Sequence, residues 1–300
     1  MKRRRMSLTA KSAWTAQLFI LPFYLGFLFF FLSPMLQSLR MSFSDISVDV
    51  TGYSMAWIGF KNFRTAFLED TNFTTNLIGT LTQMVWRIPV TLFLSLLFAM
   101  ILNQKFKGRI FVRAIFFMPV IFASGIALQL FNDDIIVRSA LTGGTVTGGS
   151  IQYSTSLKTF MMESGFGTAI VDIATGVSDS LFSMVWRVGV QMIIFLAGLQ
   201  NISPSLYEAS SIEGAGSWEN LWKITLPVLS PIIFVNLIYT IIDNFTDSGN
   251  VIMRQITQLI GQQVNKLGLA SSFAWTYFAV IGIILAVITL LYRKLSGGEA

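Results

Sequence analysis

Apolar runs about as long as a bilayer is thick recur along the chain. They cover roughly residues 16–37, 77–102, 112–131, 179–200, 227–249 and 273–292. A helix needs about 20 apolar residues to cross the hydrocarbon core. Helices and closed barrels are the only structures that satisfy every backbone hydrogen bond in lipid. The sequence therefore predicts an all-α polytopic membrane protein with six transmembrane helices, organised as a single transmembrane domain over residues 1–300.

Composition excludes most enzyme classes. Hydrophobic residues make up 53% of the chain and charged residues 12%, whereas a soluble domain carries about 25% charged residues. Cysteine and histidine are both absent from the sequence. This excludes disulfides, the usual zinc sites and nucleophiles that pair with histidine. We predict no catalytic residue and no metal ligand, and the basic residues beside the apolar runs indicate topology signals rather than a nucleic-acid surface.

Lysine and arginine predict the orientation of the chain. Twelve of the 21 lie at the two ends of the chain and in the second and fourth connections between runs, and seven lie in the other connections. By the positive-inside rule, the N- and C-termini are then cytoplasmic. One extracytoplasmic connection contains "LTGGTVTGGS", residues 141–150. Its composition favours a flexible loop, and a contact surface for an external partner is the alternative.

A polar segment at about residues 203–227, "SPSLYEASSIEGAGSWENLWKITLP", stands between two apolar runs on the cytoplasmic side. Ser203 followed by Pro204 predicts a helix start, and Gly214 predicts its end. Ser217 is expected to cap a second helix with two tryptophans on one face. Two interpretations remain open: an elbow that docks into a partner's groove, or an interfacial hairpin that only connects two spans.

The same segment resembles the EAA motif of the membrane subunits of bacterial ABC importers. The matching residues are Glu208, Ala209, Gly214, Ile224, Leu226 and Pro227. Three further stretches are similar to the carbohydrate-uptake branch, the maltose-type permeases: "FLAGLQNISPSLYEAS" (195–210), "WIGFKNF" (57–63) and "RAIFFMP" (113–119). The chain departs from the motif at Ser210, where the family usually has alanine, and at Glu213, where it usually has aspartate. The 141–150 stretch is a further departure from the family pattern.

This resemblance implies a type I ABC importer permease (MetI-like) fold in the bacterial plasma membrane. It also implies a second homologous permease, two ATPase subunits, an extracytoplasmic solute-binding protein and a saccharide substrate. ATP and magnesium would be held by the ATPases, so this chain is expected to bind no cofactor and to be no enzyme. The residues expected to couple to the ATPase are Glu208, Ala209, Ser210, Glu213, Gly214, Leu226 and Pro227.

The C-terminal "LSGGE", residues 295–299, is similar to the nucleotide-contacting signature of ABC ATPases. That signature works opposite a phosphate-binding loop, and the chain contains no GxxxxGK[ST] sequence. We therefore interpret this match as a chance resemblance.

Two matching stretches place arginine inside the apolar runs: "MVWRIPV" (84–90) and "MVWRVGV" (184–190). Arginine in a helix centre costs a few kcal/mol, so it is expected to face protein or water. One interpretation is a substrate pathway, lined by Trp86, Arg87, Gln129, Trp186, Arg187, Asn236, Asp243 and Asn244. The alternative is that each arginine pairs with Asp243 or Asp247 or reaches outward to the membrane surface. Unpaired arginines would favour an anionic saccharide, and paired ones a neutral sugar.

Two other functions remain open. One is an ABC permease for a non-sugar solute, such as a polyamine or a phosphate-type compound. The other is an ion-coupled secondary transporter that works without an ATPase. That function needs carboxylates within the membrane to bind the driving ion, and Asp243 and Asp247 are the candidates.

Overall fold

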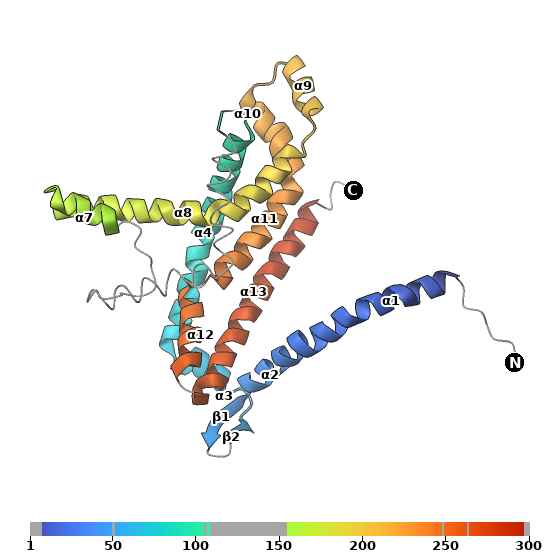
Figure 1. Cartoon of the computed structure of the whole chain (residues 1–300), viewed down its shortest axis with the longest axis vertical. Helices are drawn as coiled ribbons and strands as arrows, with labels where there is room; N and C mark the ends of the chain where they lie inside the picture. The colour runs from blue at the N-terminus through green and yellow to red at the C-terminus, as the bar shows by residue number, and fades with distance from the viewer. Residues whose placement is uncertain are drawn as a thin grey trace. The chain divides into compact units, whose positions relative to one another are not determined.

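The apolar runs form long helices in the computed structural model, which describes residues 8–49, 52–104, 107–108, 155–247, 249–262 and 264–296 (Figure 1). The α-helices are α1 (Leu8–Gly26), α2 (Ser33–Ser42), α3 (Lys61–Arg64), α4 (Thr71–Asn103), α7 (Thr155–Glu163), α8 (Thr168–Gln200), α9 (Pro204–Ile212), α10 (Ser217–Asn220), α11 (Leu226–Thr246), α12 (Val251–Gln262) and α13 (Leu267–Ser296). Strands β1 (Ser44–Asp49) and β2 (Gly52–Trp57) form an antiparallel hairpin. Short π-helical segments cover Phe27–Leu32, Thr65–Glu69 and Leu221–Thr225, and a 3₁₀ turn covers Val264–Lys266.

Within the described residues, four helical stretches are long and apolar enough to cross a membrane. They are Gln17–Ser42, Thr71–Asn103, Ser217–Thr246 and Leu267–Leu295. These coincide with four of the expected spans. The expected span 112–131 lies outside the described residues, and 179–200 falls in the C-terminal part of α8, where Val188–Gln200 is a shorter apolar helix. The count of six spans therefore stays a prediction.

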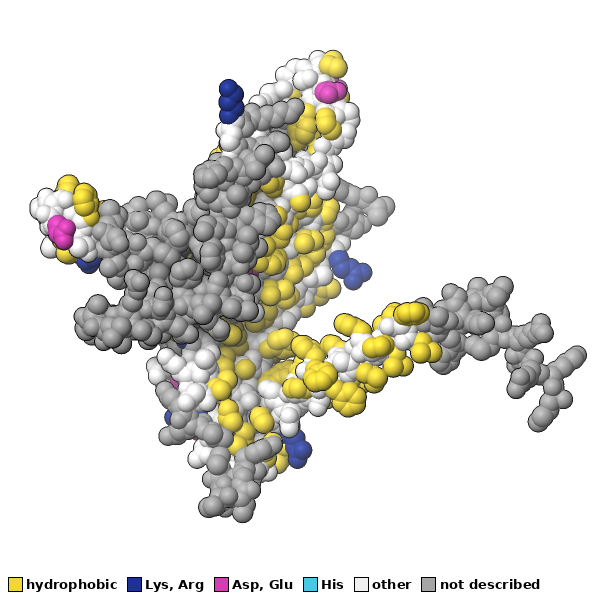
Figure 2. Space-filling model, in the orientation of Figure 1, with side chains coloured by type: hydrophobic (Ala, Val, Ile, Leu, Met, Phe, Trp, Pro, Cys, Tyr) yellow, Lys and Arg dark blue, Asp and Glu magenta, His cyan; other side chains and the backbone are white. Residues whose placement is uncertain are grey.

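Hydrophobic side chains cover the outside of the described part of α1 and of the π-helical segment that follows it (Figure 2). Phe19 of α1 is 83% exposed, and Phe30 of the π-helical segment is 87% exposed. Such large apolar side chains are stable on the outside of a helix when hydrocarbon surrounds it. Their exposure agrees with the membrane class that the sequence predicts.

The described residues divide into two compact units. The first contains the residues up to Gly79 together with Val251–Ile284, and the second contains Thr80–Asn250 together with the residues from Leu285 onward. Helices α4 and α13 each contribute to both units. The polar segment and helices α8 and α11 all belong to the second unit.

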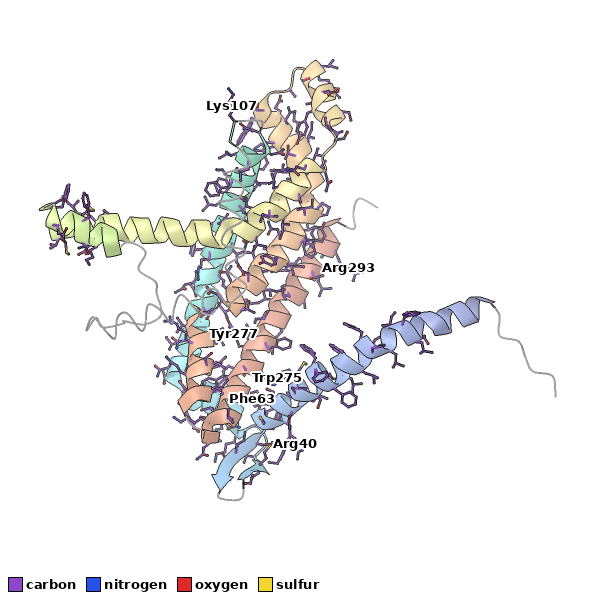
Figure 3. The ribbon with its side chains drawn as sticks, viewed as in Figure 1. Arg40, Phe63, Lys107, Trp275, Tyr277 and Arg293 are labelled. Carbon is purple, nitrogen blue, oxygen red and sulfur yellow. The ribbon has the colours of Figure 1, made fainter. Side chains whose placement is uncertain are left out.

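In the first unit, the β1–β2 hairpin follows α2 directly, and Arg40 lies near this junction (Figure 3). The Asn62 side chain donates hydrogen bonds to the carbonyl oxygens of Ser42, at 3.1 Å, and Ser44, at 2.9 Å. Gly268, near the start of α13, packs directly against the Ser44 carbonyl. The all-helical expectation did not include this hairpin, because its short extended stretch lies between apolar runs.

Aromatic packing reinforces the same unit. Phe43 stacks on Trp57 with ring centroids 5.4 Å apart and meets Phe63 at 5.1 Å. Phe73 of α4 packs on Phe273 of α13 at 4.0 Å, and both rings are fully buried. Burial of an aromatic side chain contributes a few kcal/mol. These contacts hold the starts of α4 and α13 together.

The second unit is built on the pair of helices α8 and α11, which lie side by side (Figure 1). Their close approach is centred on Gly198. A methyl group at this position would lie 2.5 Å from Ile232 Cδ1 and 2.9 Å from Leu229 Cδ2. The surrounding core contains Ala99, Leu102, Val188, Met192, Phe195, Leu196, Leu199, Ile202 and Leu229. This core fixes the cytoplasmic-side end of the pair, as the sequence orients it, next to the polar segment.

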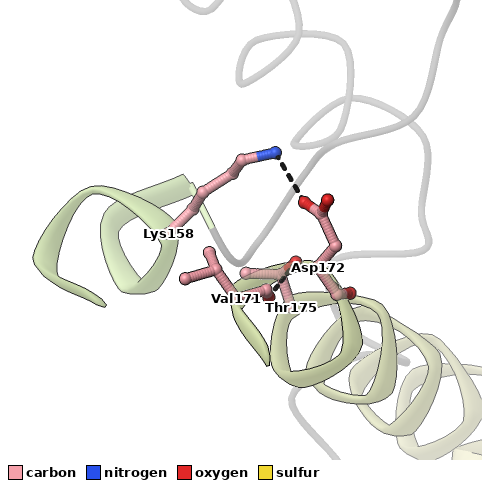
Figure 4. A network of polar contacts seen from close by, with 4 residues as sticks. All are labelled: Lys158, Val171, Asp172 and Thr175. Carbon is pink, nitrogen blue, oxygen red and sulfur yellow. Dashed lines mark hydrogen bonds and ion pairs between the residues drawn. The ribbon is translucent and has the colours of Figure 1, made fainter. Parts of the chain in front are cut away.

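Helix α7 folds back on the start of α8. Lys158 forms an ion pair with Asp172 at 3.2 Å, and the Thr175 hydroxyl donates to the Val171 carbonyl at 2.8 Å (Figure 4). Both charged side chains are substantially exposed, so the pair is worth little by itself. The described chain resumes at Thr155, shortly before Lys158. The Gly/Thr-rich stretch of residues 141–150 lies outside the described residues.

Candidate functional site

Helix α9 starts where the sequence predicts. Ser203 has the extended backbone of a cap residue, with φ −62° and ψ 129°, and Pro204 is the first helical residue. The Ser203 hydroxyl, however, pairs with the Ser205 hydroxyl at 2.8 Å and does not bond to a helix N–H. The fixed φ of proline therefore contributes to this helix start where a side-chain cap does not.

Gly214 ends α9 in a left-handed conformation, with φ 82°. The N–H of Ala215 donates to the Ser210 carbonyl at 3.0 Å, and the N–H of Gly214 donates to the Ser211 carbonyl at 3.1 Å. This pair of bonds is the Schellman arrangement, which favours glycine because side chains with a Cβ rarely adopt positive φ. The glycine that the family motif shares is thus required by the backbone.

The second helix, α10, begins at Ser217, but its cap is Gly216 and not Ser217 as the sequence suggested. The Glu219 carboxylate accepts a hydrogen bond from the Gly216 N–H at 3.2 Å and pairs with Lys223 at 3.3 Å. A glutamate at the third helical position satisfies an N–H that would otherwise lack a partner. Hydrogen bonds at the end of α9 and at the start of α10 therefore both fix the turn between these helices.

The elbow exposes acidic and apolar groups together. Glu208, Ala209 and Glu213 are exposed. Large apolar side chains lie along the same segment: Leu206, Ile212 (87% exposed), Trp218 (70% exposed) and Trp222. Figure 2 shows acidic and hydrophobic side chains together at the tip formed by α9. Grouped, exposed apolar side chains mark a contact surface. This contact is either with a partner protein or with the membrane interface, so both interpretations of the segment stay open.

Ser210 is buried inside this elbow, and its hydroxyl donates to the Tyr207 carbonyl at 2.9 Å. The serine that departs from the family pattern is therefore a satisfied polar group facing inward. Leu226 and Pro227 open α11, directly after the π-helical segment. These three residues shape the elbow, whereas Glu208 and Glu213 form its exposed face.

Two hydroxyl groups fasten α9 to the start of α11. Tyr207 Oη lies 2.9 Å from Thr225 Oγ1, and the Thr225 hydroxyl donates to the Asn220 carbonyl at 3.1 Å. Thr225 is buried. Sequence reasoning did not single out either residue, because tyrosine and threonine this far apart carry no recognisable pattern.

Further along the two helices from the elbow, a buried polar seam joins α8 and α11. The Asn236 side chain donates to the Gln191 carbonyl at 2.9 Å, and the Gln191 side chain donates to the Asp243 carboxylate at 3.2 Å. Thr240 and Asn244 continue along the same helix, each bonded to a carbonyl one turn earlier. Asn236 is fully buried and Gln191 is 1% exposed. The structure thus brings together three predicted residues, Asn236, Asp243 and Asn244.

Two acceptors in this seam have no hydrogen-bond partner among the residues that the structure describes: Gln191 Oε1 and Asn236 Oδ1. A buried acceptor without a donor costs roughly 1–3 kcal/mol. The site is therefore suited to a ligand that supplies hydroxyl donors. Sequence reasoning missed Gln191, although a glutamine inside the apolar run of α8 is the kind of signal that points to such a site.

The other predicted pathway residues belong to α4 and α8 or lie outside the described residues. Trp86 is 76% exposed on α4, and Arg87 beside it is exposed and has an interaction partner. Gln129 lies outside the described residues. Trp186 and Arg187 lie in α8, one turn before Gln191, but their side chains are outside the described part of the chain.

Comparisons with known proteins agree with the family resemblance of the sequence. No family model matches the sequence. The chain is 30% identical over 293 residues to a probable ABC transporter permease protein, YesP, of Bacillus subtilis, covering 90% of this chain and 87% of that protein. It is also 30% identical over 302 residues to the arabinooligosaccharides transport system permease protein AraP of Bacillus subtilis, covering 93% and 88%.

The fold resembles a chain in the crystal structure of a bacterial alginate ABC transporter in complex with an alginate pentasaccharide-bound periplasmic protein. The TM-score is 0.65 at 19% identity, and the match covers 95% of this chain and 96% of that chain. At this identity the likeness establishes the fold. The helical membrane fold class that the sequence predicts is therefore confirmed.

Proposed function

This chain belongs to the sugar permease family of bacterial ABC importers, and from that membership we propose that it lines, with a second homologous permease, the path of an oligosaccharide. It is a multi-pass protein of the inner membrane. The observation that carries the proposal is the polar elbow, whose exposed glutamates and apolar side chains stand at the end of the α8–α11 pair. Both termini face the cytoplasm in this arrangement, as does the elbow.

The elbow docks into a groove of an ATPase subunit. Glu208, Ala209 and Glu213 form the contact face, and Ser210, Gly214, Leu226 and Pro227 shape it. A carboxylate at such a contact meets a basic group of the partner. Two ATPase subunits hold ATP and magnesium, and this chain binds neither. An extracytoplasmic binding protein delivers the sugar, as a periplasmic protein accompanies the structurally similar alginate transporter.

The sugar passes the seam between α8 and α11. Within the described part of the chain, Gln191 Oε1 and Asn236 Oδ1 lack donors, and sugar hydroxyls are donors. Asp243 and Asn244 add polar groups along α11, with Asp243 held by Gln191. The remaining proposed lining residues are Trp86, Arg87, Gln129, Trp186 and Arg187. Tryptophan rings suit stacking on the apolar face of a sugar ring, and the two arginines suit hydroxyl or carboxylate groups.

The general test is to tag the chain, purify it gently from its native membrane and identify the bound proteins by mass spectrometry. An ATPase and a second permease should be recovered together with this chain. Recovery of the chain alone, moving solute along an ion gradient in vesicles, would instead establish a secondary transporter. Attention would then turn to Asp243 and Asp247 as ion-binding residues.

Replacing Gln191 with methionine tests the seam. The substitution keeps the length of the side chain but removes both polar groups, so Asp243 loses the hydrogen bond from Gln191 and a sugar hydroxyl loses an acceptor. We expect the maximal uptake rate to fall roughly tenfold, as the loss of one or two hydrogen bonds implies, while the ATPase still co-purifies. Thr246→Val is the matched control, because the Thr246 hydroxyl only bonds within its own helix, to Ile242 at 2.8 Å. Equal uptake by the two variants would remove the seam from the pathway.

A competition experiment between a neutral and an anionic trisaccharide tests whether the transported sugar is charged. Uptake of labelled arabinotriose and of labelled trigalacturonate is measured in cells that express the importer, each against an excess of the other unlabelled sugar. Arginine binds carboxylates through paired hydrogen bonds. If Arg87 and Arg187 line the pathway, trigalacturonate should therefore be the better competitor. The Arg87→Gln variant should lose this preference. Better competition by arabinotriose would indicate a neutral substrate.

A further inference from the structure

The hydrogen bond between Tyr207 and Thr225 has a defined direction. The Thr225 hydroxyl has one proton, which it donates to the Asn220 carbonyl. Tyr207 must therefore donate to Thr225 Oγ1 across the 2.9 Å that separates the two oxygens. Both hydroxyl protons are used, and the buried oxygen of Thr225 depends on Tyr207 for its donor.

The tyrosine ring is itself part of the helix packing. Tyr207 packs against the core cluster that contains Leu199 at the end of α8, Ile202 just after it, and Leu229 near the start of α11. The elbow is thus fixed to the α8–α11 pair by one aromatic ring and one hydrogen bond.

The segment that Thr225 closes is irregular. Leu221–Thr225 forms a π-helical segment between α10 and α11, and helices kink at such segments. Without the Tyr207–Thr225 bond, the chain on either side of the elbow offers two points of bending: this π segment and the turn around Asn201–Ser203. The bond spans both of them.

We propose that Tyr207 is a positioning residue that makes α9 and α11 move as one rigid body. This inference rests on the proposed function, in which an ATPase moves α9. A displacement of α9 then reaches the seam of Gln191, Asn236 and Asp243 without being absorbed at the π segment, because the same helix α11 carries Thr225 at its cap and Asn236 three turns later.

The competing explanation is that the Tyr207–Thr225 bond only stabilises the elbow locally. The distance between two spin labels distinguishes this explanation from rigid-body movement. The natural sequence contains no cysteine, so spin labels can be placed at Ser205→Cys on α9 and Val235→Cys on α11, both exposed positions. In the purified complex, the distance distribution should be narrow and the same with and without a non-hydrolysable ATP analogue and magnesium. With Tyr207→Phe added, the distribution should broaden or shift when the analogue binds.

A second readout is the amount of labelled trisaccharide, arabinotriose or trigalacturonate, transported for each ATP hydrolysed in proteoliposomes. Tyr207→Phe and Thr225→Val should lower this ratio roughly three- to tenfold, as expected for the loss of one hydrogen bond. Thr225→Ser, which keeps the hydroxyl, should restore it. Tyr292→Phe is the matched control, because the Tyr292 ring stacks on Phe234 at 3.9 Å and its hydroxyl plays no part in that contact.

The outcomes are distinct. A Tyr207→Phe complex with wild-type distances and a wild-type ratio overturns the role of Tyr207 and leaves the proposed function intact. A nucleotide-dependent change of the distance in the wild-type complex also overturns it, because α9 and α11 then move separately. Absence of any ATPase from the wild-type complex overturns both proposals.

Discussion

Replacing Glu208 with arginine is expected to release the ATPase from the importer and to abolish ATP-dependent uptake. Glu208 is exposed on α9, beside the exposed Leu206 and Ile212. Reversing a charge inside a protein interface costs about 2–5 kcal/mol, which weakens binding at least roughly thirtyfold. The measurement is the quantity of ATPase that co-purifies with the tagged chain, together with sugar uptake by the same cells.

A matched charge reversal distinguishes docking from general damage. Glu163→Arg changes another exposed glutamate, at the end of α7, in a connection predicted to lie on the other side of the membrane. It should leave both the ATPase and uptake in place. Glu208→Asp should retain part of the binding because it keeps the charge. Retention of the ATPase by Glu208→Arg would assign the contact to another part of the chain.

Gly268→Ala is expected to destabilise the protein by about 3 kcal/mol, at the upper end for an overpacked site. A methyl group at Gly268 would overlap the Ser44 carbonyl oxygen and would lie 3.0 Å from Asn62 Nδ2 and 3.2 Å from the Met41 carbonyl oxygen. Two of these three neighbours are backbone atoms, which cannot move aside as a flexible side chain can. The bonds from Asn62 to Ser42 and Ser44 would be disturbed at the same time.

The measurement is the midpoint temperature of thermal unfolding in detergent, which is monitored as the loss of monodisperse protein on heating. Gly282→Ala provides the control on the same helix, because its added methyl group meets no atom within 4 Å apart from its chain neighbours and the adjacent backbone of α13. In a helix interior, alanine is favoured over glycine by up to about 1 kcal/mol, so this variant should unfold at the same or a higher temperature. If Gly268→Ala unfolds no earlier than Gly282→Ala, the Asn62–Gly268 contact does not hold the first unit together.

The elbow was largely predictable from the sequence, because its signals are local. Pro204 fixes the backbone at a helix start, and Gly214 adopts the positive φ that other residues avoid, so each acts through its own backbone. The cap of α10 was assigned to Ser217 but is Gly216. Both residues are compatible with a cap, and the choice depends on the reach of the Glu219 carboxylate to the Gly216 N–H.

The seam was only partly predictable. Asn236, Asp243 and Asn244 stand out in the sequence as polar residues in an apolar run. Sequence reasoning missed Gln191, although it forms hydrogen bonds with both Asn236 and Asp243. Its role depends on the rotation of α8 relative to α11, which Gly198 permits by allowing the helices to approach closely. No pattern within α8 alone specifies that rotation.

The sequence by itself determined the membrane class, four of the helical spans that the structure describes, the elbow between two of its apolar runs and the sugar permease family. These follow from hydrophobic length, from backbone preferences of proline and glycine, and from matching residues close together in the chain. Only the tertiary structure decided that Tyr207 meets Thr225, that Gln191 meets Asp243, and that Gly268 meets Ser44. Each pair lies far apart in sequence, and contact requires helix packing that no local preference encodes.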